Sequence, residues 1–359
     1  MKTFMGSLAP AFLIVVSAHG PLAGSARAQA VSLFGLVDIG IRQVHNGSAG
    51  RYRSQSSNGL NPDLLGFRGT EDLGGGVSAG FWLETGFLPD AGATFDPFWN
   101  RRATVSLVDR RLGELRIGLD TVPTFYGLYP YTPTGALGVG SVIGDGGTTS
   151  ILSDLGSGVT TLRAANNVIG YFLPDTLGGV YGQASVSAGE GVVGTRYVGA
   201  RIGYQNETLD LSVAHGQTPV ALHDTFRQTV LGAACKLGPT RLTGLLVQAR
   251  YASLSGGPRR QNLVSLGAEV QVGVGTAHAS VVHGEMSGGA PGSGYSSADG
   301  AQQVAIGYIH NLSTRTALYS TAATLGNRGA SKLVVDTGRS GMKSGERSTG
   351  VEAGIRHIF

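Results

Sequence analysis

The chain has 359 residues, 59 of them glycine, and only 14% of its residues are charged. This composition is too apolar for a disordered chain, and the single cysteine, Cys235, excludes a fold held together by intramolecular disulfides. The formal net charge of +4 comes without a cluster of Lys and Arg residues, so no nucleic acid partner is expected.

The N-terminus has the pattern of a secretory signal peptide. Lys2 precedes the apolar run "LAPAFLIVV" (8–16), and the small residues that follow end in "ARAQA", where Ala28 and Ala30 fit an A-x-A cleavage site. The apolar run is too short to span a bilayer. We therefore expect residues 1–30 to be removed from the mature protein.

From residue 31 onward the sequence alternates with a period of two, as a β-strand with two different faces does. In "VSLFGLVDIGI" (31–41) the odd-numbered residues are apolar or Gly, whereas Ser32, Asp38 and Gly40 lie on the other face. The segment "VSAGFWLE" (77–84) repeats the pattern, and "EDLGGG" (71–76) before it predicts a tight turn between antiparallel strands.

The rest of the chain repeats this unit, with segments of about ten residues separated alternately by short turns and long polar connections. The seven short turns lie at 71–76, 110–114, 174–179, 206–208, 237–240, 272–275 and 311–314. The eight long, Gly/Ser/Pro-rich connections lie near 45–60, 87–98, 121–162, 189–196, 216–227, 251–261, 285–301 and 325–347. Fifteen connections join sixteen strands, so we predict an all-β, sixteen-stranded antiparallel transmembrane β-barrel with short periplasmic turns and long extracellular loops over 31–359.

The two faces of the strands indicate what surrounds them. One face is apolar and the other is polar or small, so the apolar faces are expected to contact lipid and the polar faces to line water. Sixteen strands enclose a lumen that side chains do not fill. The sequence therefore predicts a water-filled channel.

Four segments give the chain a resemblance to the general porins of Gram-negative bacteria, of the type common in beta-proteobacteria and Neisseria. "VSLFGLVDIGI" resembles the family's opening strand, "GFRGTEDLGGG" its best-marked turn, "RTALY" a motif near its fifteenth strand and "AGIRHIF" its terminal strand. The resemblance implies a homotrimer in the outer membrane of a Gram-negative cell. It also implies that the third long loop, 121–162, folds into the lumen as a constriction.

In porins of this family, arginines on one wall of the constriction face acidic residues on the other. The residues that match by parity or by local motif are Arg42, Arg68, Arg102, Arg116 and Arg163, with Asp120, Asp145 and Asp154 as the nearby acids. The chain departs from the family where Gly118, Leu119 and Asp120 replace the usual Gly-Arg-Gln, and its third loop is poor in acids for its length.

The C-terminal strand carries a further implied signal. Val351, Ala353, Ile355, His357 and Phe359 share one parity. A final Phe on the lipid face is what the outer-membrane assembly machinery recognises in the family, so Ile355, His357 and Phe359 are the expected assembly signal.

The sequence thus predicts a general diffusion porin for passive transport of small hydrophilic solutes and ions, with a weak anion preference supplied by the arginines. A substrate-specific porin, or an adhesin or receptor barrel acting through its loops, remains the alternative. Besides the homotrimer, the expected partners are outer-membrane lipid, lipopolysaccharide and the assembly machinery.

No catalytic, cofactor-binding or metal-binding residue is expected. "GVSAG" (76–80) matches G-x-S-x-G, but Ser78 lies within a strand instead of at a strand-to-helix turn. His278 and His283 lie on opposite faces of one strand and make a poor metal pair. Cys235 is interpreted as a small lipid-facing or interfacial side chain.

Overall fold

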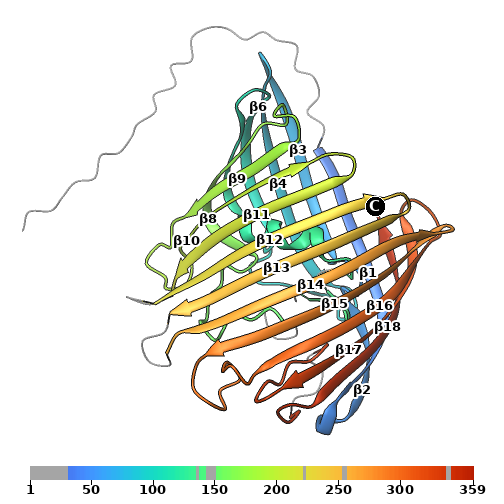
Figure 1. The fold of residues 1–359 in the computed structure, drawn as a ribbon. Helices are drawn as coiled ribbons and strands as arrows, with labels where there is room; N and C mark the ends of the chain where they lie inside the picture. Colours follow the sequence, from blue (N-terminus) through green and yellow to red (C-terminus); the bar gives the residue numbers. More distant parts are fainter. Residues whose placement is uncertain (1–30, 135–136, 143–150, 221–223, 253–256, 337–340) are drawn as a thin grey trace, which may run out of the picture.

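The alternating segments form strands that close into a ring in the computed structural model, which describes residues 31–134, 137–142, 151–220, 224–252, 257–336 and 341–359. The residues before 31, including the expected signal peptide, lie outside the described part of the chain. Consecutive strands pair antiparallel around the ring, and the last strand returns to the first (Figure 1). The predicted sixteen-stranded antiparallel barrel is confirmed.

Ring closure joins the two ends of the chain. β1 (Val31–Asn46) pairs with β18 (Arg347–Ile358) from Leu36 opposite Ile358 to Asn46 opposite Ser348. Beyond that register, the backbone N–H of Gly35 donates to the carbonyl of Phe359 at 3.1 Å, and the N–H of Phe359 donates back at 3.0 Å. The ring of Phe359 lies over Gly35, where a Cβ atom would collide with it.

The wall contains sixteen strands in the described residues, although the chain forms eighteen extended segments there. β2 (Arg51–Ser57) and β3 (Leu64–Gly74) both pair with β1 and are two halves of one interrupted strand. β5 (Ala93–Thr94) pairs only with the end of β4. The other wall strands are β4 (Val77–Leu88), β6 (Arg102–Asp109), β7 (Gly113–Thr121), β8 (Ala164–Phe172), β9 (Val180–Ser187), β10 (Tyr197–Gln205), β11 (Leu209–Pro219), β12 (Thr225–Leu237), β13 (Thr240–Ala252), β14 (Arg259–Val272), β15 (Gly275–Gly288), β16 (Gly300–Asn311) and β17 (Thr316–Arg328).

The first connection differs from the prediction. Residues 45–60 were expected to form a long loop, but the chain reverses through the short helix η1 (Gly47–Ala49) and continues at once as β2. The irregular stretch lies further on, at 58–63, between β2 and β3 within the wall. A Gly/Ser-rich composition is compatible with a strand when its outward face is polar, which is why the sequence pattern was misleading here.

At this interruption, the carboxylates of buried aspartates replace the missing backbone hydrogen bonds between neighbouring strands. Asp38 on β1 accepts the backbone N–H groups of Leu60 at 2.7 Å and Asn61 at 2.6 Å. Asp63 in turn accepts the N–H of Asp38 at 2.5 Å. Asp38 is fully buried and Asp63 is 1% exposed, so these bonds satisfy backbone groups that water does not reach.

The outward faces of the strands are apolar over a broad band. Val105, Ile117, Ile169, Leu246 and Ile306 are each about half exposed, and a soluble domain would not leave so many large apolar side chains uncovered. Cys235 shares this outward parity, as its register opposite Leu209 and Leu242 shows. In the described residues, no helix has the length and apolarity needed to cross a membrane.

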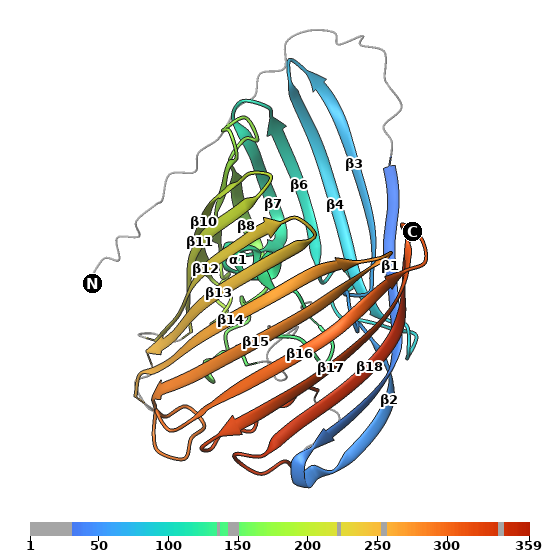
Figure 2. The same ribbon diagram turned by 45° about the vertical axis from the view of Figure 1, so that its right-hand side comes forward.

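The long connection after β7 folds into the barrel. It runs from 122 to 163, one residue later than predicted, because Thr121 still pairs with Ala164 of β8. It begins with α1 (Pro123–Leu128) and η2 (Tyr129–Tyr131), which lie inside the ring beside β10 to β13 (Figure 2). We call its described residues, 122–134, 137–142 and 151–163, the internal loop.

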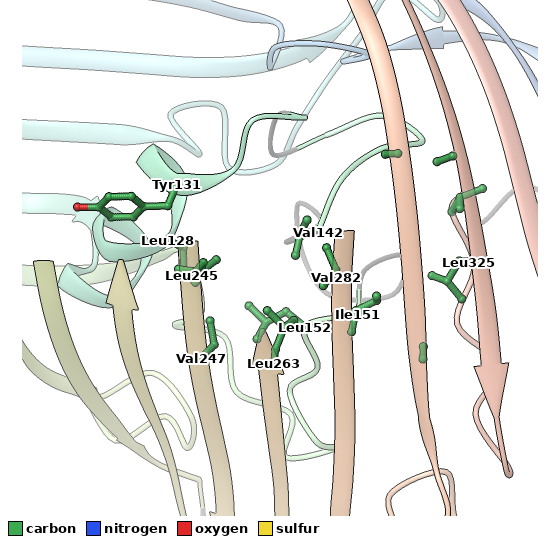
Figure 3. Close-up of a cluster of buried hydrophobic side chains, with 14 of the residues drawn as sticks. Leu128, Tyr131, Val142, Ile151, Leu152, Leu245, Val247, Leu263, Val282 and Leu325 are labelled. Carbon is green, nitrogen blue, oxygen red and sulfur yellow. The ribbon is translucent and has the colours of Figure 1, made fainter. Parts of the chain in front are cut away.

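The internal loop packs on the inner face of β11 to β17 through apolar contacts. Leu128, Tyr131, Val142, Ile151 and Leu152 from the loop are at most 5% exposed. Figure 3 shows them beside strand residues that belong to the same buried cluster, including Val247, Leu263, Val282, Leu245 and Leu325. The expectation that the inner face is polar or small and lines water was therefore wrong for this half of the barrel, where larger apolar side chains of the inner face contact the loop.

Polar side chains of the wall hold the backbone of the internal loop at several points. Gln261 accepts the N–H of Ser153 at 2.9 Å and donates to the carbonyl of Ile151 at 2.5 Å. Gln303 donates to the carbonyls of Gly140 and Ser141 at 2.9 and 3.0 Å. These bonds satisfy loop carbonyls that have no strand partner.

The apolar contact between loop and wall can be tested with neighbouring leucines on opposite faces of β13. We expect Leu245→Ala to loosen the internal loop, because Leu245 is 1% exposed and truncation of a buried Leu costs about 2–5 kcal/mol in well-packed cores. Leu246→Ala is the matched control, since Leu246 faces outward, where lipid tails replace the lost contact. Single-channel recordings should show greater current noise for Leu245→Ala alone, and equal noise in both variants would contradict the packing role.

Candidate pore constriction

The internal loop covers one half of the inner wall and leaves space against the other half. A cavity of about 560 Å³ lies between them. Phe125, Leu152 and Leu162 line it from the internal loop, whereas Asn58 and Arg101 line it from the facing side. The loop side of the cavity is largely apolar, whereas the facing side mixes polar residues with apolar ones such as Phe95 and Leu119.

Arginines gather on the inner face of β3, β6 and β7, outside the β11 to β17 wall that carries the apolar packing of the internal loop. The registers place Arg68 opposite Trp82, Arg102 opposite Glu84 and Arg116 opposite Ser106, all on the inner face. Sequence parity had indicated the same inner face for these three arginines.

A compact ion-pair cluster forms around Arg116. Its Nε donates to Glu114 Oε1 at 2.8 Å, and its Nη1 donates to Asp120 Oδ2 at 2.8 Å. Arg102 Nε lies 3.7 Å from Asp120 Oδ1. Asp120 is 1% exposed, so two guanidinium groups offset one buried carboxylate.

Gly118 lies between Arg116 and Asp120 in β7. Its φ of +137° belongs to a region that favours glycine, and a Cβ there would collide with the carbonyl of Ala103. Asp120 has the same parity as Arg116, so ordinary strand alternation places it on the inner face beside Arg116, and the register shift of this pair of strands adds its extra residue to β8. The departure from Gly-Arg-Gln at 118–120 thus places an acid inside the arginine cluster.

Aromatic rings support the arginines as well. The guanidinium carbon of Arg102 lies 4.6 Å from the ring centroid of Trp82, and that of Arg116 lies 4.0 Å from the ring of Phe172. Arg68 lies 5.3 Å from the ring of Phe34 and 5.2 Å from that of Trp82. The ring faces attract the cations without using their N–H donors.

The remaining predicted residues take different positions. Arg42 pairs with Glu352 at 2.8 Å and also with Asp336, while Glu352 accepts the N–H of Val139 in the internal loop. Arg42 therefore belongs to the attachment of the loop to β1 and β18. Arg163 lines the cavity and donates to the carbonyl of Asn100 at 3.0 Å.

The acids expected in the internal loop do not join the arginine cluster. Asp154 accepts the backbone N–H of Gly156 at 2.9 Å and so caps its own turn. Asp145 lies outside the described residues. Of the three acids singled out, Asp120 alone pairs with the predicted arginines in the part of the chain that the structure describes.

Sequence reasoning missed several charged residues of the inner wall. Arg101 pairs with Glu84 at 2.7 Å, and Glu84 also accepts the indole N–H of Trp82 at 3.0 Å. Arg201, stacked at 4.6 Å on Tyr181, was also missed. The inner parity of Glu84 and Trp82 was available from the alternation of β4, but their partners come from other strands and loops.

Comparison with known proteins agrees with this architecture. A family model described as "Gram-negative porin" matches residues 11–330. The chain is 37% identical over 349 residues to "Outer membrane porin protein 32" of Delftia acidovorans, covering 94% of this chain and 96% of that protein. The chain belongs to the Gram-negative porin family.

Solved porin structures share the fold. The "Anion-selective porin from Comamonas acidovorans" matches with a TM-score of 0.81 and 33% identity, over 92% of this chain and 100% of that chain. OmpT of Vibrio cholerae, described as a trimer form, matches with a TM-score of 0.67 over 93% of this chain and 100% of that chain, at 11% identity. The protein is accordingly an outer-membrane porin, and its barrel encloses a channel for small hydrophilic solutes.

Tyr126 brings a buried hydroxyl from the internal loop to the arginine cluster. Tyr126 of the internal loop contacts the Arg116 cluster, and burial, reinforced by the negative charge of Asp120, raises the pKa of its hydroxyl. Tyr126 therefore stays neutral at the pH of the cell exterior. Among the described residues, no group of three His, Cys, Asp or Glu side chains is arranged to hold a metal ion.

We expect Asp120→Asn to increase the anion preference of the porin. The change removes one negative charge within 2.8 Å of Arg116 and leaves the guanidinium groups of Arg102 and Arg116 less compensated. Asp154→Asn is the control with the same charge change, made in a residue that caps its own turn. In a salt gradient, the reversal potential should shift toward the value of a perfectly anion-selective channel more in Asp120→Asn than in Asp154→Asn. Equal shifts would show that the place of Asp120 beside the arginines has no effect on selectivity.

Proposed function

We propose that this porin is a general diffusion channel with a weak anion preference, and that its selectivity arises between the internal loop and the arginine-bearing wall. The observation that carries the proposal is the distribution of compensated and uncompensated charge on the inner wall. The 33% identical structural relative described as an anion-selective porin supports the same direction of preference.

Most carboxylates of the inner wall are engaged by arginines or by backbone N–H groups. Glu84, Glu114, Asp120, Glu269 and Glu352 each lie within salt-bridge distance of an arginine. Asp38 and Asp63 are buried against backbone donors, as described above. Asp210 accepts hydrogen bonds from the hydroxyls of Tyr131 and Tyr181.

Several inner-wall arginines, in contrast, have no carboxylate within 4.0 Å among the described residues. They are Arg68, Arg201, Arg259 and Arg356. Arg259 donates to the carbonyl of Leu155 at 2.9 Å and Arg356 to the side-chain oxygen of Asn61 at 3.0 Å, so neutral acceptors hold these two guanidinium groups without cancelling their charge. The charge that a permeating ion meets is therefore mainly positive.

This arrangement accounts for passive permeation. An ion in the lumen keeps most of its hydration, and the guanidinium groups lower the free energy of an anion relative to a cation. Paired carboxylates keep the net field modest, because compensated pairs contribute little at a distance. Arg42, Arg102, Arg116, Arg163 and Asp120 shape this field, and the internal loop sets the width of the constriction.

We expect the double substitution Arg68→Gln and Arg201→Gln to lower the anion-to-cation permeability ratio several-fold. Both side chains rest on aromatic rings and have no carboxylate partner in the described structure. The matched control is Arg110→Gln with Arg111→Gln, since both residues are exposed in a short turn outside the lumen. Planar-bilayer reversal potentials measure the ratio.

The conductance experiment also tests the channel itself. A folded wild-type protein that does not conduct would favour a plugged receptor or adhesin barrel that acts through its loops. Saturation of the current by one solute class would instead favour a substrate-specific porin. An unchanged permeability ratio in the double variant would show that Arg68 and Arg201 do not contribute to selectivity, although the protein would still be a channel.

We further propose that the porin assembles as a homotrimer in contact through β1 and β2. The outward face of these strands carries Gln43, Arg53 and Gln55, and Arg53 donates to Gln43 at 2.7 Å. Lipid tails disfavour such polar side chains, whereas a second copy of the chain provides partners for them.

The C-terminal residues Ile355, His357 and Phe359 are proposed as the signal for the outer-membrane assembly machinery. Phe359 lies at the seam of the barrel, where its ring covers Gly35.

We expect Phe359→Ala to lower the amount of folded porin in the outer membrane about tenfold. Ile358→Ala, one residue away on the other face, is the control. Heat-modifiability of membrane fractions measures folded porin, and equal levels for the two variants would argue against the signal.

A further inference from the structure

The cavity between the internal loop and the facing wall lies at the mouth of the channel on the side of the long loops. Gly86 lines it near the end of β4, and Arg101 and Arg163 line it just before β6 and β8 begin. Asp120 of the arginine cluster pairs with Ala165, two residues beyond Arg163. A solute that enters from the side of the long loops therefore reaches this cavity before it reaches the arginine cluster.

Much of the cavity wall is apolar, although the cavity lies in a water-filled channel. Phe125, Leu152 and Leu162 line it from the internal loop, and Phe95 lines it from the connection after β4. Phe95 is 40% exposed. Water in contact with such side chains is released when an apolar group takes its place, and this release favours solutes that carry an apolar group.

Arg101 and Arg163 supply the positive charge of the cavity lining. Arg163 donates to the carbonyl of Asn100, the residue before Arg101, so the two arginines are neighbours in the lining. Arg101 uses its Nε to pair with Glu84 at 2.7 Å. Its terminal nitrogens have no acceptor among the described residues, and they are not buried. Such a pair of terminal N–H groups can hold a carboxylate through two parallel hydrogen bonds.

Asp63 also lines the cavity, but its carboxylate is engaged elsewhere. Asp63 is 1% exposed, and its two oxygens accept the backbone N–H groups of Asp38 at 2.5 Å and Asn58 at 2.8 Å. It therefore offers no partner to the ammonium group of a cation or a zwitterion. The lining described here suits an anion.

The apolar and the cationic parts of the lining meet at Gly86. A Cβ at Gly86 would lie 3.3 Å from Cε2 of Phe95 and 3.4 Å from Cδ of Arg101, so the ring and the arginine stem flank the same point of the wall. A ligand whose aromatic ring lies one or two carbon atoms from a carboxylate can contact both. The cavity volume of about 560 Å³ is sufficient for such a ligand together with part of its hydration water.

We propose that this cavity is an entry subsite for amphipathic organic anions, namely carboxylates with an aromatic or branched apolar body, of which phenylacetate is an example. The apolar body contacts Phe95 and the apolar side chains of the internal loop, and the carboxylate binds Arg101 and Arg163. The inference rests on the anion-preferring channel proposed above and adds a preference among anions. Chloride and acetate gain little from the apolar lining, so amphipathic anions are enriched at the channel mouth relative to them.

The test measures how strongly three probes reduce the chloride current of the wild-type porin in planar bilayers. The probes are phenylacetate, acetate, which lacks the ring, and phenylacetamide, which lacks the charge. Phenylacetate should halve the current at a concentration about tenfold below that of acetate, because the ring loses its contact with water. Phenylacetamide should also need a concentration about tenfold higher than phenylacetate, because a neutral amide binds guanidinium groups more weakly.

Two pairs of variants locate the subsite. Phe95→Ala should raise the half-blocking concentration of phenylacetate about fivefold. Phe98→Ala is its control, since Phe98 is an exposed residue of the same connection that does not line the cavity, and it should leave this concentration unchanged. Arg163→Gln should also raise the concentration about fivefold. Arg196→Gln, in an exposed loop residue, makes the same charge change as a control.

The same recordings separate the subsite from the proposed channel. The reversal potential in a potassium chloride gradient reports the anion preference without an organic probe, so a wild type without that preference would contradict the proposed function itself. An anion-preferring channel that phenylacetate and acetate block equally would contradict the subsite alone. So would equal block by phenylacetamide and phenylacetate, or equal half-blocking concentrations in Phe95→Ala and Phe98→Ala.

Discussion

Backbone hydrogen bonding in an apolar medium is the constraint on which this structure depends. A strand in lipid has no water to satisfy its N–H and C=O groups, so the sheet must close and leave no edge. The pairing of β1 with β18 achieves this, and the two bonds between Gly35 and Phe359 complete it. Closure also fixes the register, and the register decides for every residue whether it faces lipid or lumen.

The interruption at 58–63 shows how strictly the constraint holds. Where the ladder between β1 and the second strand breaks, the side chains of Asp38 and Asp63 accept the backbone N–H groups that lost their partners. Burying two carboxylates is costly unless each is hydrogen-bonded, and here each is. The lumen therefore contains a structural pair of acids that is not available to permeating ions, and this leaves the arginines as the accessible charges.

Sequence alternation was sufficient to predict the number of wall strands and the inner position of Arg68, Arg102 and Arg116, because the side-chain period of a strand is fixed, but it missed β2, which was expected to be loop. It could not predict the apolar half of the lumen. Leu245 and Leu246 are identical in type and adjacent, and only the packed internal loop makes one of them a buried contact. The ion pairs were also out of reach, since Arg42 meets partners about 300 residues away in sequence.

The two ways of holding an arginine on the inner wall have different consequences for transport. A carboxylate fixes the guanidinium but cancels its charge, as in the pairing of Arg116 with Glu114 and Asp120. An aromatic ring orients the guanidinium and leaves its charge uncancelled, as Tyr181 does for Arg201. A wall that combines the two attracts anions without binding them tightly. Conduction requires that an ion leave the channel as readily as it enters. Such a wall can therefore combine fast passage of ions with only a weak preference for anions over cations.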